Sequence, residues 1–269
     1  YASEMAWKIA DELVQVRGGR GFETADSQRA RGERGLEAEQ VLRDLRIMRI
    51  FEGSTEIMHL LIAREAVDAH LAVAGDIIDP EASRDDKLKA VAKAGAFYAG
   101  WLPTLVAGKG AVPTSFADFG RLAAQVRFVE RTTRKLARSI FYGMGRWQGA
   151  MERKQAFLGR VVDIGAELFA MTAACVRAKT EQATHPEGVE LADLFCQQAR
   201  VRIGALFTAL WDNTDDADDV AAKQALAGRY AFVEAGIVLP SDQGPWVTPV
   251  EPGPSTKPDV RRQVPRASG

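Results

Sequence analysis

The sequence predicts an all-α protein, in which a short helical unit is followed by an additional antiparallel bundle of helices. Apolar residues recur at intervals of three and four through most of the 269 residues, as on the buried face of a helix. Short turns separate these segments, which is typical of antiparallel bundles. Hydrophobic residues make up 46% of the chain and charged residues 26%, so a packed core is expected rather than disorder.

Charge and composition argue against several classes of function. The net charge of −1 disfavours a nucleic-acid-binding protein, which would need a strongly basic surface. No run approaches the ~18 apolar residues of a membrane-spanning helix, and no basic-then-apolar leader opens the sequence. Cys175 and Cys196 fall inside helical patterns without metal-ligand spacing. We therefore expect two buried, unreactive thiols, no metal site and a cytoplasmic location.

The stretch from Arg43 to Arg64 organises the rest of the chain. Gly53 allows the chain to bend, and Ser54 or Thr55 can cap a helix that starts there. Glu56 would lie in the first turn of that helix, where a negative charge suits the helix dipole. Apolar spacing predicts one helix before the turn and one after it, from Val41, Leu45 and Met48 and from Ile57, Leu60, Leu61 and Val67.

Glu52 occupies the predicted turn, between two apolar helices and beside the free backbone N–H groups of the second helix. Such a place can hold a base close to an anionic ligand. The alternative is an ordinary helix-end glutamate that pairs with Arg46 or Arg49. Spacing alone favours this alternative, because carboxylates are common at helix ends.

Two segments together resemble the acyl-CoA dehydrogenases, flavoenzymes that place a double bond between the α and β carbons of an acyl-CoA thioester. Residues 43–55 read RDLRIMRIFEGST and are similar to the family segment that carries the catalytic base, with Glu52 in the position of the base. Residues 15–21 read QVRGGRG and are similar to a family element that touches the FAD of the neighbouring subunit. Two linked signatures in the right order are a specific signal.

The resemblance implies a cofactor, a substrate and redox partners. FAD would be the cofactor, an acyl-CoA the substrate and an electron-transferring flavoprotein the electron acceptor. Acyl-CoA oxidases share the fold and the base, so oxidase activity is the alternative. The glycines of the first element would also serve as a helix C-cap. The implied contacts are Gln15, Gly18 and Gly19 with the FAD of the partner subunit, and Gly53, Ser54, Thr55 and Glu56 with the subunit's own FAD.

Resemblance and composition together divide the chain into three parts. Residues 1–74 correspond to part of the family's C-terminal helical domain, residues 75–237 to an additional helical bundle, and residues 238–269 to a partly disordered tail with seven of the eleven prolines. The family's N-terminal helical domain and middle β-domain would precede Tyr1, so we expect a C-terminal fragment. Alone, the fragment should neither hold FAD tightly nor turn over substrate, because most of the flavin pocket would be missing.

The periodicity also predicts where the elements lie. The residues from Phe22 to Ala38 are interpreted as a solvated surface loop. The alternative is that its arginines, such as Arg29, Arg31 or Arg34, reach the phosphates of FAD or CoA. Helices are predicted from about Ala2 to Val16, from the turn to about Ala74, from Leu88 to Leu105, around Phe119–Trp147, Phe157–Cys175 and Leu191–Leu210, and from about Val220 to Ala235.

The strongest amphipathic helix, around Phe119–Trp147, carries a row of arginines roughly opposite its apolar stripe. Between Arg121 and Arg160 there are ten basic residues and two acidic ones. We interpret this face as solvated, or as paired with the acidic run Asp212–Asp219, which would end the helix predicted around Leu191–Leu210. The alternative is contact with anionic lipid headgroups. The row consists of Arg127, Arg131, Arg134 and Arg138.

The helical extension resembles the C-terminal domain of the very-long-chain acyl-CoA dehydrogenases. This resemblance implies a homodimer and peripheral contact with the inner face of a membrane. A non-enzymatic interpretation is a helical assembly or membrane-surface module in which Glu52 is a relic. The joint presence of Gln15, Gly19, Glu52 and Gly53 speaks against it. An acyl-CoA dehydrogenase fragment is therefore the leading prediction.

Overall fold

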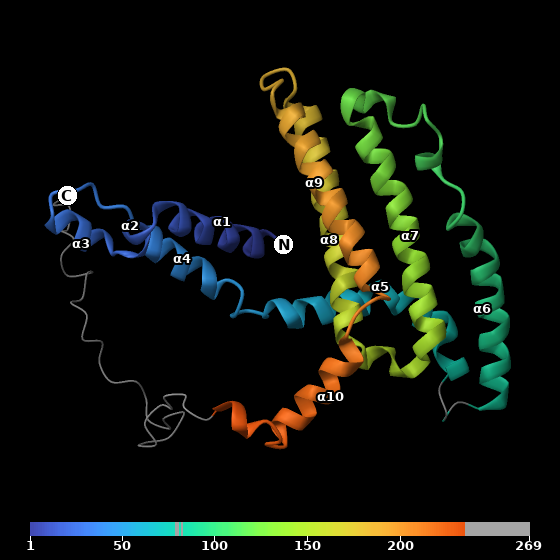
Figure 1. Cartoon of the computed structure of the whole chain (residues 1–269). Coiled ribbons are helices and arrows are strands. Elements are labelled where there is room, and N and C mark those ends of the chain that lie inside the picture. The colour runs from blue at the N-terminus through green and yellow to red at the C-terminus, as the bar shows by residue number, and fades with distance from the viewer. Residues whose placement is uncertain (79–80, 82, 235–269) are drawn as a thin grey trace, which may run out of the picture. The chain divides into compact units, whose positions relative to one another are not determined.

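Helices are the only regular elements in the part of the chain that the computed structural model describes, residues 1–78, 81 and 83–234. The all-α prediction is confirmed. The chain divides into two compact units, Tyr1–Asp215 and Asp216–Gly269. The long helices in Figure 1 are α1 (Ala2–Arg17), α4 (Ala38–Ile47), α5 (Thr55–Ile78), α6 (Arg84–Thr104), α7 (Ala123–Trp147), α8 (Gln155–Glu181), α9 (Gly188–Ala209) and α10 (Asp215–Leu226). The short helical segments are α2 (Gly19–Phe22), α3 (Ala25–Ala30), η1 (Lys109–Ala111), η2 (Ala117–Leu122), η3 (Gln148–Arg153) and η4 (Ala231–Glu234).

The core of the bundle lies along α8, which packs against both α7 and α9 (Figure 1). Short connections join these three helices, so neighbours in the bundle run antiparallel. The sulfur atoms of Cys175 and Cys196 lie 3.6 Å apart at the contact of α8 with α9, and both cysteines are free and buried, as predicted. The most deeply buried side chains follow the helical spacing: Ile164, Met171 and Cys175 on α8, and Cys196, Ala199 and Ile203 on α9.

The arginine row of α7 binds the backbone of the segment that precedes this helix. Arg134 reaches this backbone indirectly. It donates to Glu130, and the second carboxylate oxygen of Glu130 accepts from the backbone N–H of Gly110 at 2.9 Å. Neither a solvated face nor pairing with the acidic run describes this row, because the preceding loop lies against it. Three arginines donate to backbone carbonyl oxygens in antiparallel order: Arg138 to Leu105, Arg131 to Gly110 and Arg127 to Ser115.

The acidic run begins a helix rather than ending one, which corrects the sequence interpretation. α9 ends at Ala209, and α10 starts at Asp215. Carboxylates in the first turn of a helix are favourable because they face the positive end of its dipole. Asp215 also accepts two hydrogen bonds from the guanidinium group of Arg160, at 2.6 and 2.7 Å, and these bonds lower the pKa of Asp215. At Arg160 and Asp215, therefore, the basic segment does meet the acidic run.

The last predicted helix, from about Val220 to Ala235, is shorter and starts earlier. α10 ends at Leu226, and Gly228 then takes a positive φ of 77°, which ends the helix as a glycine commonly does. The single turn η4 follows. Ala235 and the predicted tail at residues 238–269 lie outside the described residues.

The connection from residue 22 to 38 is partly helical, where the sequence analysis expected a loop. Thr24 caps α3, since its hydroxyl oxygen accepts from the backbone N–H of Ser27 at 3.2 Å. The fully buried Gln28 holds the two ends of this connection together. Its amide donates to the carbonyl oxygen of Arg20 and accepts from the backbone N–H of Leu36. Nearby acids pair with two arginines, Arg29 with Asp26 and Arg31 with Glu23.

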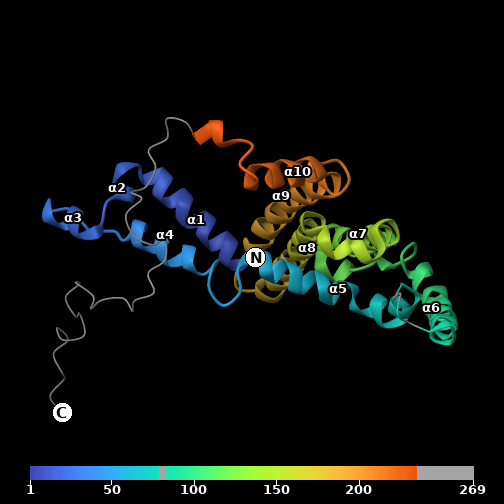
Figure 2. The ribbon, with the colours of Figure 1, turned by 90° about the horizontal axis from the view of Figure 1, so that it is seen from below.

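Within the first unit, α5 packs against both α6 and α8 (Figure 2). It ends at Ile78, past the predicted end near residue 74. His59 Nε2 lies 3.2 Å from a carboxylate oxygen of Asp163 on α8. The buried His70 lies 3.2 Å from the Tyr98 hydroxyl on α6, and burial lowers the pKa of His70. In the described part of the chain, no helix is long and apolar enough to cross a bilayer.

Because α7 and α8 lie close together at Gly143, one added methyl group there should lower the stability of the protein. A Cβ atom at Gly143 would lie 2.9 Å from two ring atoms of the buried Phe157, whereas a Cβ at Gly145 would meet nothing within 4 Å. We expect Gly143→Ala to destabilise the protein by about 1–3 kcal/mol through overpacking. Gly145→Ala, the matched control, should leave stability unchanged or raise it by up to about 1 kcal/mol. Thermal unfolding followed by circular dichroism measures both, and equal melting temperatures would contradict this packing.

Candidate functional site

The turn between α4 and α5 has the form that the sequence predicts, two helices meeting at a short bend. At the end of α4, the carbonyl oxygen of Ile47 accepts from the backbone N–H of Phe51 at 3.1 Å. Across the bend, the backbone N–H of Thr55 donates to the carbonyl oxygen of Arg49 at 3.3 Å. The first residue of α5 therefore lies beside the last turn of α4.

Glu52 holds an unusual backbone conformation in this bend. Its φ is 57° and that of Gly53 is 107°. Glycine adopts positive φ at no steric cost, whereas glutamate rarely does, and such residues persist where surrounding structure fixes them, often at functional sites. The Glu52 side chain is exposed, and it forms no ion pair with Arg46, Arg49 or any other described residue. The helix-end ion pair that was the alternative is therefore not formed.

Arg49 binds Glu4, near the start of α1, instead of Glu52. The carboxylate of Glu4 accepts one hydrogen bond from Arg49 Nε at 2.5 Å and another from the Thr55 hydroxyl at 2.5 Å. The guanidinium carbon of Arg49 also lies 4.6 Å from the centroid of the Trp7 ring, a cation–π distance. Because Arg49 precedes Glu52 and Thr55 follows it, one carboxylate holds both arms of the turn. We call Glu4, Trp7, Arg49 and Thr55 the Glu4 clasp.

The clasp keeps Glu4 ionised. Burial opposes ionisation of this carboxyl group, but the hydrogen bonds from Thr55 and Arg49, together with the charge of Arg49, outweigh burial and lower the pKa of Glu4. A carboxyl group with a lowered pKa in the folded state contributes stability above its unfolded pKa. That contribution is lost as the pH falls through the lowered value. The turn should therefore loosen in acid.

The N-terminus of α5 presents backbone donors next to Glu52. The N–H groups of Gly53 and Ser54 have no hydrogen-bond partner in the described part of the chain. Free N–H groups at a helix N-terminus attract anionic oxygen atoms. The carboxylate of Glu56 is bound by its own backbone N–H and by the Ser54 hydroxyl, which lowers the pKa of Glu56. These two free donors are therefore available to an anionic group of a ligand.

Gln15, Gly18 and Gly19 lie at the other end of α1. Eleven residues separate Gln15 from Glu4, or about 16 Å along a helix that rises 1.5 Å per residue. Gly18 has φ 59° and ψ −141°, which favour glycine, and no atom lies within 4 Å of where a Cβ would be at Gly18 or Gly19. The buried Nε of Arg17 beside them has no partner among the described residues. These residues lie apart from Glu52, with free space at their backbone.

Exposed apolar side chains surround Glu52. Singly exposed apolar residues are ordinary, but a contiguous group marks an interaction site. A partner that covered this group would also shield the carboxylate from water. In the described part of the chain these side chains stay 38–58% exposed: Ile47, Met48, Ile50, Phe51, Ile57 and Met58.

Residues 1–67 match the family described as acyl-CoA dehydrogenase, C-terminal domain. This region holds the Glu4 clasp, the Glu52 turn and the glycine element that follows α1. This match confirms the family assigned from the sequence signatures, and residues 1–67 are its C-terminal domain region.

Two relatives extend this match along the chain. The chain is 57% identical over 268 residues to the probable acyl-CoA dehydrogenase FadE10 of Mycobacterium tuberculosis, covering 98% of this chain and 41% of the relative. It is 29% identical over 252 residues to the mitochondrial very long-chain specific acyl-CoA dehydrogenase of Bos taurus, covering 90% and 35%. The crystal structure of an acyl-CoA dehydrogenase complexed with FAD from Bacillus anthracis matches with a TM-score of 0.49 and 23% identity, over 83% of this chain and 34% of that one. The chain thus spans less than half the length of these relatives.

Sequence reasoning missed two members of the site. Glu4 and Trp7 lie on α1, more than 40 residues before the turn that they hold. A single ion pair leaves no periodic signal in a sequence. The only hint was Arg49, which was named as a partner for Glu52 and pairs with Glu4 instead.

The Glu4 clasp predicts a pH-dependent stability difference. Glu4→Gln removes the charge that binds Arg49 and should cost about 1 kcal/mol near neutral pH, since a partly exposed ion pair is worth less than a buried one. The loss should shrink as the pH falls from the ordinary glutamate pKa of 4.5 toward the lowered pKa of Glu4 in the folded protein, because protonation removes the charge that Glu4→Gln lacks. Thermal unfolding between pH 3 and 7 measures this difference. Glu12→Gln, an exposed acid on the same helix, is the control, and a pH-independent effect of Glu4→Gln would contradict the clasp.

Proposed function

We propose that this chain is the C-terminal part of an FAD-dependent acyl-CoA dehydrogenase, in which Glu52 removes the α-proton of an acyl-CoA thioester. The observation that carries the proposal is the position of Glu52. It lies on a left-handed turn that the Glu4 clasp holds from both sides, and it has no ion-pair partner among the described residues. A base that is fixed in place but not neutralised by a cation suits proton abstraction.

The reaction needs a carboxylate in a dry, fixed place. The α-proton of a thioester is weakly acidic, so a base removes it efficiently only when it is well positioned. Bound FAD would supply the acceptor for the hydride of the β carbon, and the product after loss of the proton and the hydride would be the trans-2-enoyl thioester. Glu52 receives the proton on a carboxylate oxygen. The exposed apolar side chains around Glu52, once covered by the rest of the protein and the acyl chain, would exclude water.

Two groups of residues are proposed to bind two different FAD molecules. The segment Gly53–Glu56 offers free backbone donors beside Glu52 and would bind the flavin of its own subunit. Gln15, Gly18 and Gly19, about 16 Å away along α1, would bind the flavin of a partner subunit. This separation supports the proposal, because one flavin contact near the base and another at the far end of α1 suit a homodimer that shares its sites.

The remaining partners follow from the same proposal. An electron-transferring flavoprotein would accept the electrons and the protein would work in the cytoplasm, with acyl-CoA oxidase activity as the alternative. The additional helices are also proposed to contact the face of a membrane, through cations that the chain leaves available. Arg127, Arg131 and Arg138 already donate to carbonyl oxygens of the preceding loop, so fewer cations are free to meet lipid.

The test uses the full-length protein that contains this chain. Its flavin absorbance is recorded without oxygen while acyl-CoAs of increasing length are added to wild type and Glu52→Gln. We expect some thioesters to bleach the wild-type flavin, and the bleaching rate to fall by about a hundred- to ten-thousand-fold in Glu52→Gln, the usual contribution of a positioned base.

Glu65→Gln is the matched control, because Glu65 is an exposed acid on α5 away from the turn. It should bleach at the wild-type rate. Equal rates in wild type and Glu52→Gln would show that another group is the base. A full-length protein that takes up no flavin would favour the non-enzymatic helical module.

A further inference from the structure

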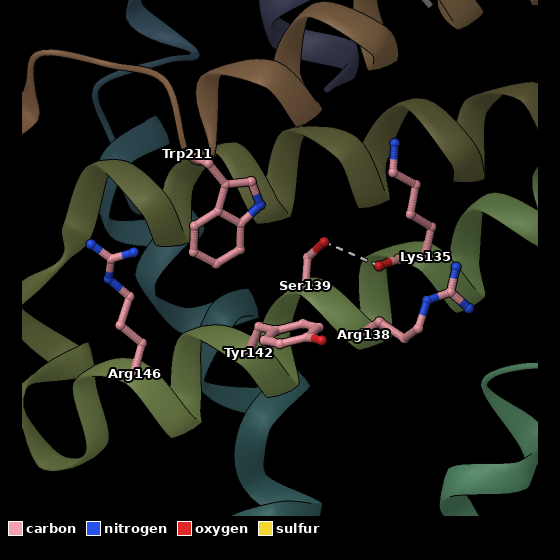
Figure 3. Close-up of a pocket in the computed structure, with 6 residues that line it drawn as sticks. All are labelled: Lys135, Arg138, Ser139, Tyr142, Arg146 and Trp211. Atoms are coloured by element: carbon pink, nitrogen blue, oxygen red, sulfur yellow. Dashed lines mark hydrogen bonds between the residues drawn. The ribbon is translucent and has the colours of Figure 1, made fainter.

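A basic groove lies on α7, away from the Glu52 turn. It is open to solvent and has a volume of about 490 Å³. Five of its residues recur at spacings of three and four and so share one face of α7, and Trp211, just after α9, forms the opposite wall (Figure 3). The groove is lined by Lys135, Arg138, Ser139, Tyr142, Arg146 and Trp211.

The charge in this groove is not neutralised by the chain around it. No carboxylate lines the groove, and its three cations form no ion pair in the described part of the chain. Their contacts are with uncharged groups: Lys135 with the Phe207 ring, Arg138 with the Leu105 carbonyl oxygen and Arg146 with the Trp147 ring. A concave surface of one charge sign concentrates counter-ions, so the groove should attract an anion.

The two aromatic rings of the groove narrow the choice of anion. Figure 3 shows Trp211 and Tyr142 in the middle of the groove, with Arg146 toward one end and Lys135 and Arg138 toward the other. Tyr142 is 71% exposed and Trp211 45% exposed, so both rings can be reached from solvent. Trp211 is nevertheless held in place, because its ring stacks on that of Trp147 at 5.9 Å. Exposed aromatic rings beside cations are the usual platform for a nucleotide base with its phosphates.

We propose that this groove binds a soluble nucleotide phosphate, with the base against Trp211 and Tyr142 and the phosphates on the cations. The side chains divide the task. Arg138 donates one N–H to the Leu105 carbonyl oxygen, and its other guanidinium N–H groups lie one turn of α7 from Lys135. These groups and Lys135 can hold one phosphate group, and Arg146 can hold another. The proposal does not depend on the role of Glu52, since no residue of the groove belongs to that site.

The experiment is calorimetric titration of the full-length, FAD-loaded protein with ADP, and with pyrophosphate as a probe that lacks the base. Wild type should bind ADP, and more weakly as salt is added. Arg146→Gln should weaken binding of both probes by about tenfold, the value of one charge-assisted hydrogen bond. Tyr142→Ala should weaken binding of ADP and leave that of pyrophosphate unchanged.

Matched controls lie on α8, outside the groove. Arg177→Gln removes an equally exposed cation, and Phe169→Ala an equally exposed ring; both should bind ADP as wild type does. The four changed side chains are on the surface, so folding should be unaffected. The proposal is overturned if wild type does not bind ADP, or if the groove variants bind it as tightly as the controls do. It is also overturned if phosphatidylglycerol vesicles, rather than ADP, bind in a way that depends on Arg146.

Discussion

The left-handed bend at Glu52 depends on an ion pair from a distant helix. Positive φ is unfavourable for a glutamate, and a short loop between two helices could relax in several ways. Glu4 prevents this, because its carboxylate binds Arg49 before the bend and Thr55 after it. The packing of α1 on α4 therefore does more than bury apolar surface, since it brings the Glu4 carboxylate to the turn. A change in α1 far from Glu52 in sequence can thus alter the orientation of the proposed base.

The additional helices α7, α8 and α9 are stabilised mainly by an apolar core rather than by a single ion pair. Their core is apolar and periodic, with the most buried side chains on α8 and α9. Arginines of α7 then bind loop carbonyl oxygens at three successive places, so the chain between residues 105 and 115 follows the helix closely. Buried or crowded carbonyl groups need donors, and arginine can reach them from a helix surface. Arg138, at the end of this row, also lines the basic groove, together with Lys135 and Arg146.

Local signals predicted much of the fold, and long-range contacts explain the rest. Apolar spacing identified α8 and α9 because their buried side chains recur every three or four residues. Gly53 indicated the turn because glycine can bend the chain at no steric cost, and its φ in the structure is 107°. No such signal exists for Gln28, whose burial depends on backbone groups of Arg20 and Leu36. The start of α10 was misjudged because a run of aspartates looks like a break until the helix dipole is considered. The proposed boundary near residue 74 stays a prediction, as does the role of each residue at the Glu52 turn.

The central claim is that the Glu52 turn holds a carboxylate ready to take a proton from an acyl-CoA. A crystal structure of the full-length, FAD-loaded protein with a non-oxidisable acyl-CoA thioester tests it most directly. The account predicts a Glu52 carboxylate oxygen about 3–3.5 Å from the α carbon, on the face away from the flavin, with the Glu4 clasp intact. A structure with another carboxylate at the α carbon, and with Glu52 pointing into solvent, would contradict it.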